Sequence, residues 1–272
     1  MSQDQRPART AATIRFLDAV RQRVATVVVG QDVVVARVGP MAGSVAEKMM
    51  PAPDFDPGGR ELLDDRRGLV STERAQRLLP TPFKLANNGE PVTPFVVLAA
   101  RCQGIAVSGG EAIRGAFAQI GLVVAPPDGT GEINIFTLWH FTTHLTLVRN
   151  LQNVGLASQH VPDMGYAVTL GGKVGSTEIT VPASAQPPFI LAGDIREPSQ
   201  PVTFNGNWWA KAGDRLLKLN SVVPKATFGD AQLTLTTRAA NGLGQLIGGA
   251  TLNFAVLQRF NTFPQVHTTV SV

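Results

Sequence analysis

The 272-residue sequence has one cysteine, one tyrosine and few charged residues. A single cysteine cannot form a disulfide within the chain, so the sequence is not a disulfide-stabilised scaffold. Charged residues make up 16 % of the chain, against about 25 % in a typical globular protein. The apolar fraction of 44 % and the net charge of only +4 exclude an intrinsically disordered chain. The sequence is that of a globular protein with a substantial core.

Long hydrophobic runs are also missing. The longest uncharged segment, residues 239–258, is interrupted by four glycines and several amide side chains, which makes it a poor candidate for a membrane-spanning helix. The first ten residues, MSQDQRPART, are polar, and no apolar segment of a secretory signal follows them. We therefore expect no membrane partner and predict a soluble, cytoplasmic protein, with a virion component as the alternative for a viral source.

Motifs that would assign a nucleotide-binding or hydrolytic activity are absent as well. The sequence contains neither a G-x-x-x-x-G-K-[ST] phosphate loop nor a G-x-S-x-G nucleophile turn. Cys102 has no histidine close to it in the sequence, so we predict a buried structural thiol. Positive residues alternate with negative ones and aromatic stacking platforms are few, so nucleic acid is not an expected partner. The sequence assigns no cofactor.

The charged residues are distributed unevenly. Residues 1–80 hold 22 charges in 80 positions, whereas residues 81–272 hold 22 charges in 192 positions. Within residues 13–28, apolar side chains recur at helical spacing: Leu17, Val20, Val24 and Val27. This pattern predicts a charged helical N-terminal segment over residues 1–80 and a low-charge, β-rich body over residues 81–272.

Two shorter helices are predicted from capping signals. Ser71 is a candidate N-cap for a helix over residues 72–79, which Pro80 would end. Ser108 and Glu111 have the spacing of a capping box, which predicts a helix to about Ile120.

Beyond residue 160 the apolar pattern changes to a period of two. Residues 167–170 and 177–181 flank a glycine-rich turn and predict a hairpin. Further strand-like segments are separated by Gly, Pro and Asn at short intervals: residues 189–191, 215–219, 232–237 and 251–260. The predicted fold class is α+β, a helical N-terminal segment followed by an antiparallel sandwich or barrel.

Three of the four histidines lie within 21 residues, and an aspartate follows them: His140, His144, His160 and Asp163. If residues 137–154 are helical, His140 and His144 lie one turn apart on one face and could share a metal ion, with His160 or Asp163 as a third ligand. Alternating apolar residues before His144 favour a strand instead, which would separate the two histidines by about 13 Å. Gly155 indicates the end of a helix in the second half of the segment.

These patterns leave two interpretations of function open. In the first, the protein binds or transforms a small apolar molecule in an aromatic-lined pocket, with Trp139, Trp208 and Trp209 as binding residues and His140 or His144 as a catalytic general base. The histidines could equally be structural, hydrogen-bonded near a core edge. In the second interpretation, the chain is a self-assembling structural subunit of the coat or shell type. Both accommodate a homo-oligomer, which we expect because interface cores are depleted in charge, and whether the protein is an enzyme stays open.

Overall fold

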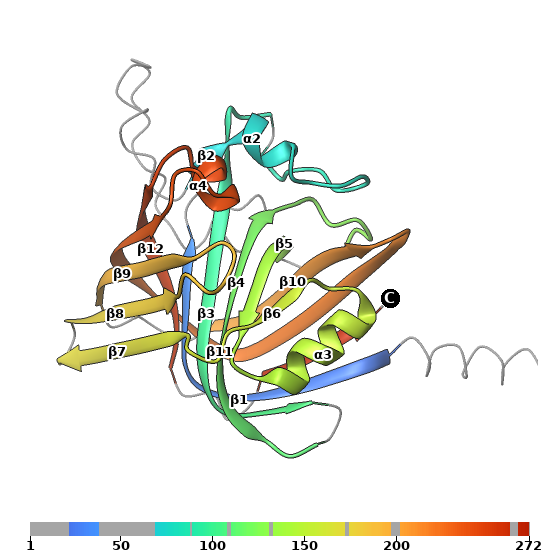
Figure 1. Ribbon diagram of the computed structural model, residues 1–272, viewed down its shortest axis with the longest axis vertical. Coiled ribbons are helices and arrows are strands. Elements are labelled where there is room, and N and C mark those ends of the chain that lie inside the picture. The colour runs from blue at the N-terminus through green and yellow to red at the C-terminus, as the bar shows by residue number, and fades with distance from the viewer. Residues whose placement is uncertain are drawn as a thin grey trace, which may run out of the picture.

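The computed structural model describes residues 22–37, 69–87, 89–107, 110–130, 133–171, 174–196, 202–261 and 266–271. β-strands dominate these ranges (Figure 1). The strands are β1 (Gln22–Arg37), β2 (Leu69–Ser71), β3 (Val92–Val107), β4 (Ile113–Val123), β5 (Ile133–Thr142), β6 (Ser158–His160), β7 (Gly165–Gly171), β8 (Val174–Val181), β9 (Phe189–Arg196), β10 (Val202–Ala212), β11 (Arg215–Thr237), β12 (Thr251–Asn261) and β13 (Val266–Ser271). The helices are α2 (Thr72–Gln76), α3 (Leu145–Val154) and α4 (Gly242–Ile247).

The strands join in one sheet, in the order β10-β5-β4-β3-β1-β12-β11-β9-β8-β7. Additional strands pair with members of this series: β13 with β1 and β11, β2 with β3, and β6 with β5. β10 pairs with both β5 and β11, so the sheet folds back on itself. Neighbouring strands are antiparallel except in the pairs β10–β5 and β5–β6.

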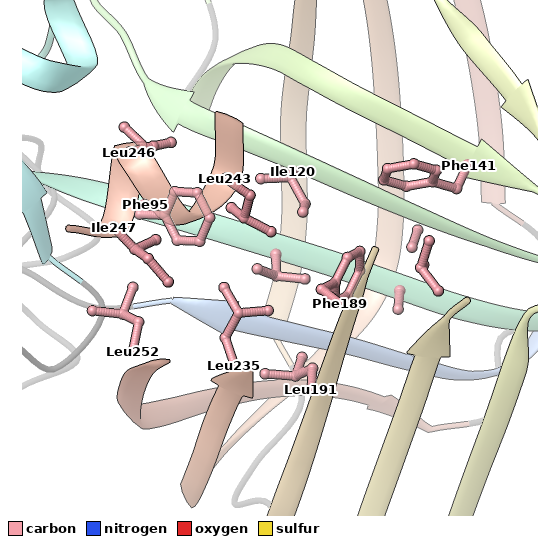
Figure 2. Close-up of a cluster of buried hydrophobic side chains, with 14 of the residues drawn as sticks. Phe95, Ile120, Phe141, Phe189, Leu191, Leu235, Leu243, Leu246, Ile247 and Leu252 are labelled. Carbon is pink, nitrogen blue, oxygen red and sulfur yellow. The ribbon is translucent and has the colours of Figure 1, made fainter. Parts of the chain in front are cut away.

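The sheet is covered on both faces, and each face has its own hydrophobic cluster. We call the face that packs against α3 the α3 face, because Leu147 and Leu151 of that helix belong to its cluster. The other is the α4 face, whose cluster includes Leu243, Leu246 and Ile247 of α4. Figure 2 shows these α4 side chains gathered with apolar residues of several strands, among them Phe95, Ile120 and Leu252.

The side chains of strand β3 contribute alternately to the clusters on the two faces of the sheet. Successive side chains of a strand point to opposite sides of the sheet. Phe95 and Val97 accordingly belong to the α4-face cluster, whereas Val96 and Leu98 belong to the α3-face cluster. A strand buried on both sides has a continuous apolar sequence rather than an alternating one.

The predicted fold class is wrong. Residues 22–37 form strand β1, where the helical spacing predicted a helix over residues 13–28. The segment is rich in valine, whose branched β-carbon restricts its side chain in a helix and suits a strand, so the helical spacing of a few apolar residues was a misleading signal. The sheet is not a closed barrel, and the fold is mostly β rather than α+β. Residues 1–21 and 38–68 lie outside the described residues, and the division at residue 80 stays a prediction.

The structure also tests the predicted short helices and the predicted hairpin. α2 begins after Ser71, as predicted, but it ends at Gln76 instead of residue 79, and the Ser71 side chain makes no capping hydrogen bond. The hairpin of β7 and β8 is confirmed. The helix expected to end near Ile120 is wrong, because strand β4 occupies this segment between β3 and β5. None of the helices in the described ranges is long and apolar enough to cross a membrane.

Candidate functional site

The histidine segment changes from strand to helix between its first two histidines. Strand β5 ends at Thr142 and α3 begins at Leu145, so His140 lies in the strand and His144 is the N-cap of the helix. Of the two alternatives for residues 137–154, the strand is therefore correct for the first half of the segment and the helix for the second half. α3 ends at Gly155, as predicted; this glycine has a φ of 98°, in the left-handed region that glycine adopts readily.

His140 is buried and held from two sides. Its Nδ1 is hydrogen-bonded to the hydroxyl of Ser158, at 2.7 Å, and its ring stacks on Phe117 with a centroid distance of 6.2 Å. Burial lowers the pKa of His140 from 6.5 to about 3, because the charged imidazolium would lose its hydration there. The ring is therefore neutral in the folded protein at ordinary pH.

Two other buried polar side chains lie on the same face of the sheet as His140. Gln119 of β4 is directly opposite His140, and Leu98, opposite Gln119 on β3, belongs to the α3-face cluster. Thr137 follows Ile135 of the same cluster by two positions, so it shares that face. Its hydroxyl oxygen is buried and has no hydrogen-bond partner within the described residues. The α3 face thus combines an apolar wall with a few polar groups.

A bulge in β5 places His140 on this face. Thr137 pairs with Gly121 and Trp139 pairs with Ile120, so Leu138 is an extra residue in the strand. Such a bulge shifts the alternation of side chains by one position. As a result Thr137 and His140, three residues apart, both lie on the α3 face.

His144 lies where α3 meets the sheet. Its Nδ1 accepts a hydrogen bond from the backbone N–H of Leu147, at 3.1 Å, which caps the helix. The side chain is 95 % buried, and its Nε2 has no hydrogen-bond partner within the described residues. A β-carbon at Gly115, which pairs with Cys102, would lie 3.7 Å from that of His144. Because Cys102 belongs to the α3-face cluster, His144 is at the edge of that face.

The remaining members of the expected metal set lie elsewhere. His160 is exposed, and its Nε2–H donates to the carbonyl oxygen of Thr143 at 3.2 Å. Asp163 is exposed too. In the part of the chain that the structure describes, no group of three or more His, Cys, Asp or Glu side chains could hold a metal ion, so the structure does not gather the four expected ligands.

The three tryptophans do not line a common site. Trp208 is buried in the α3-face cluster, whereas its neighbour Trp209 is buried in the α4-face cluster, as alternation along β10 requires. Trp139 packs against the α4-face cluster. Trp208 alone shares a face with His140.

Cys102 is on the α3 face and is buried, as predicted. Burial raises the pKa of its thiol to about 12, because the thiolate would be poorly solvated. Since the thiolate is the nucleophilic form, Cys102 is an inert part of the wall.

Charge is missing from the buried residues of both faces. No Asp, Glu, Lys or Arg is among the buried residues that the structure describes. The polar buried residues are neutral: Thr93, Gln119, Asn134, Thr137, His140, Thr142, His144, Ser158, Thr177 and Asn207. The α3 face therefore offers hydrogen-bonding groups without a described counter-charge for an ion.

A polar network occupies the α4 face near the start of β5. The side-chain oxygen of Asn134 accepts from Trp209 Nε1–H at 2.8 Å and from the amide of Asn207 at 3.1 Å. The nearby Lys218 lies over the Trp209 ring, 5.3 Å from its centroid, and donates to Asp128 at 2.7 Å. These groups satisfy one another and join three strands and a loop.

Sequence reasoning missed Gln119, Thr137 and Ser158. The signal for the first two was an isolated polar residue within an apolar strand, as in AFAQIGLV and INIFTLW. Ser158 gave no local signal, because its contact with His140 depends on the pairing of β5 with β6.

No family model matches the chain, and no curated protein matches its sequence. Among solved structures, the fold is similar to that of the enduracididine biosynthesis enzyme MppR complexed with pyruvate. The TM-score is 0.50, the sequence identity is 9 %, and the similarity covers 90 % of this chain and 87 % of that chain. At this identity the likeness concerns the fold alone.

Proposed function

We propose that the protein binds a small, uncharged, largely apolar molecule at the α3 face of its sheet. The observation that carries this proposal is the presence there of two buried polar atoms without partners among the described residues. Thr137 Oγ1 belongs to a residue opposite Gly121 of β4, and His144 Nε2 belongs to a residue beside Gly115, about 20 Å away along the same strand. Buried polar groups in proteins are almost always hydrogen-bonded, so unpaired ones beside an apolar wall indicate a place where a ligand supplies the partner.

The character of the face supports an uncharged ligand. The wall residues are apolar, including Trp208, Leu98 and Leu219, and no buried described residue carries a full charge. An ion buried without a counter-charge would pay a large desolvation penalty. The similar enzyme MppR was solved with pyruvate, which is an anion, so we propose a different ligand class for this chain.

His140 contributes to binding rather than to proton transfer in this proposal. A general base works best when its pKa is near the working pH, and that of His140 is about 3. The hydrogen bond to Ser158 orients the ring, and Gln119 lies beside it on the same face. A neutral imidazole and an amide are suited to hydrogen bonds with the polar end of a ligand.

Ligand-observed NMR tests the proposal with cyclohexanone as the neutral probe and pyruvate as the charged one. We expect the wild type to bind cyclohexanone and not pyruvate, and Gln119→Leu to weaken cyclohexanone binding about fivefold, the typical effect of one hydrogen bond. His160→Leu, at an exposed histidine, is the matched control and should bind like the wild type. Absence of cyclohexanone binding, or equal weakening by both variants, would refute the proposal.

Self-assembly is a second candidate, favoured by the edge of the sheet. β7 ends the strand order and pairs with β8 alone among the described strands. Such an edge can pair with another copy, and low charge does little to prevent it. Light scattering after size exclusion decides the matter: a homo-oligomer supports self-assembly, and a monomer mass of 28.9 kDa contradicts it.

A further inference from the structure

The two ring nitrogens of His144 have different roles. Nδ1 accepts the backbone N–H of Leu147 at the first turn of α3, a helix of ten residues. An imidazole nitrogen that accepts a hydrogen bond has no proton on it, so the neutral ring carries its hydrogen on Nε2. The capping bond thereby makes Nε2 a donor.

This donor is buried and unpaired. His144 is 95 % buried, and Nε2 has no hydrogen-bond partner in the described part of the chain. A donor that is removed from water without an acceptor is costly, which is why buried N–H groups in native proteins are nearly always paired. The atom therefore lacks an acceptor that any described residue supplies.

The surroundings of His144 favour an acceptor oxygen. The first turn of α3 has no acidic residue, so its partial positive charge is not offset locally. Gly115, whose β-carbon position is close to His144, presents no side chain of its own there. Its pairing partner Cys102 belongs to the α3-face cluster, so the β-carbon of His144 lies next to the edge of that cluster.

We infer that His144 recognises the ligand of the α3 face through a hydrogen bond from Nε2–H to an uncharged acceptor oxygen. This inference rests on the proposed function, and it narrows the ligand class to neutral molecules that combine an apolar body with an acceptor oxygen. His144 is then a specificity-determining residue: it selects an oxygen-bearing ligand over a hydrocarbon of the same shape.

The inference is tested with two probes of similar shape, 4-fluoroacetophenone and 4-fluoroethylbenzene, followed by ¹⁹F NMR titration of the full chain. The first carries an acceptor oxygen and the second does not. We expect the wild type to bind the ketone about tenfold more tightly, the upper range for one neutral hydrogen bond.

Two variants separate the capping role from recognition. His144→Asn keeps an acceptor for the Leu147 N–H, because asparagine is a good N-cap, and removes the Nε2–H donor. We expect a small loss of thermal stability, because the buried side chain becomes smaller, together with unchanged binding of 4-fluoroethylbenzene and loss of the tenfold preference for the ketone. His144→Gln restores an amide N–H near the Nε2 position and loses the cap, so the preference should return in part while thermal stability falls.

Each failure has its own signature. If neither probe binds the wild type, the proposed function is wrong and the inference with it. If both bind the wild type equally, the α3 face binds apolar molecules but His144 selects nothing. If His144→Asn keeps the ketone preference, another donor recognises the oxygen and the assignment to His144 is overturned.

Discussion

The two faces of the sheet use polar residues differently. On the α4 face, Asn134, Asn207 and Trp209 pair with one another inside an apolar surrounding. On the α3 face, Thr137 and His144 each have a buried polar atom with no hydrogen-bond partner among the described residues. The α4 face also has an unpaired hydroxyl, that of Thr93, but its larger polar groups are satisfied. The α4 face is therefore organised for stability, whereas the α3 face has hydrogen-bonding groups that no described residue uses.

Aromatic packing follows the same division. On the α4 face, Phe141 and Phe189 lie edge to face at 5.9 Å, and Phe95 approaches Phe254 at 6.1 Å. Several of these rings are seen together with α4 in Figure 2. On the α3 face, the aromatic contact of Phe117 is with His140, and Phe117 is only half-buried.

The largest expected effect is on the α4 face. Phe141→Ala should lower the free energy of unfolding by about 3–5 kcal/mol, because a fully buried aromatic ring leaves a cavity. Phe117→Ala on the α3 face is the matched change and should cost clearly less, since its ring is partly exposed. Urea denaturation measures both, and equal losses would contradict the division between the faces.

A smaller effect is expected for the polar network of the α4 face. Asn134→Ala leaves the Trp209 N–H buried without its acceptor and should cost about 1–3 kcal/mol. Trp209→Phe removes this donor, so the double variant should be less destabilised than the sum of the two single variants. Strict additivity in the denaturation experiment would show that the Asn134–Trp209 hydrogen bond contributes nothing.

The pH dependence of the free energy of unfolding tests whether His140 is buried. Its pKa is about 3 in the folded chain and 6.5 in the reference state. Below pH 6.5 the unfolded chain binds a proton that the folded chain does not, so stability falls by about 1.4 kcal/mol per pH unit toward pH 3. His140→Asn should remove this part of the slope, whereas His160→Asn, at an exposed site, should retain it. Equal slopes in the two variants would mean that His140 is not buried as described.

The smallest effect is expected at the edge of the α4 face. Burial of Asp128 on its own would raise the pKa of the carboxyl, but hydrogen bonds from Lys218 and Thr130 outweigh burial and hold this pKa below 3.8. The pair therefore stabilises the folded state at neutral pH, and this contribution is lost as the pH falls through the lowered pKa. Asp128→Asn should cost under about 1 kcal/mol at pH 7, because the carboxylate is partly exposed.

Glu73→Gln is the control for that prediction. Glu73 pairs with Arg77 on α2 with both side chains largely exposed, and we expect no measurable change in stability. If Glu73→Gln costs as much as Asp128→Asn, the Asp128–Lys218 contact is no more than a surface ion pair.

Predictions made from sequence succeeded where the cause was local. α2 begins after Ser71, Gly155 ends α3, and β7 and β8 form the predicted hairpin, because each depends on the backbone preferences of a few adjacent residues. They failed for β1 and β4, where valines at helical spacing and a capping box indicated helices. Both segments lie between other strands, and the ladder hydrogen bonds of two neighbours outweigh a local helix signal.

For the candidate site as well, the sequence indicated individual residues, and strand pairing determined which of them lie together. His140 and His144 were singled out from the sequence because three histidines lie close together, but the spacing left a helix and a strand both open. Strand β5 and the N-cap of α3 give them separate roles instead. Gln119 and Ser158 lie beside His140 only because strand β5 pairs with β4 and β6.

Composition and local pattern already indicate a chain that is low in charge, apolar enough for a large core, and interrupted by Pro and Gly. Which side chains share a face depends instead on how the strands pair. A bulge at Leu138 reverses the alternation before His140, and the neighbours in β4 and β6 determine what surrounds it. Strand register is set by contacts between residues far apart in the chain, and a shift of one residue moves every side chain to the opposite face.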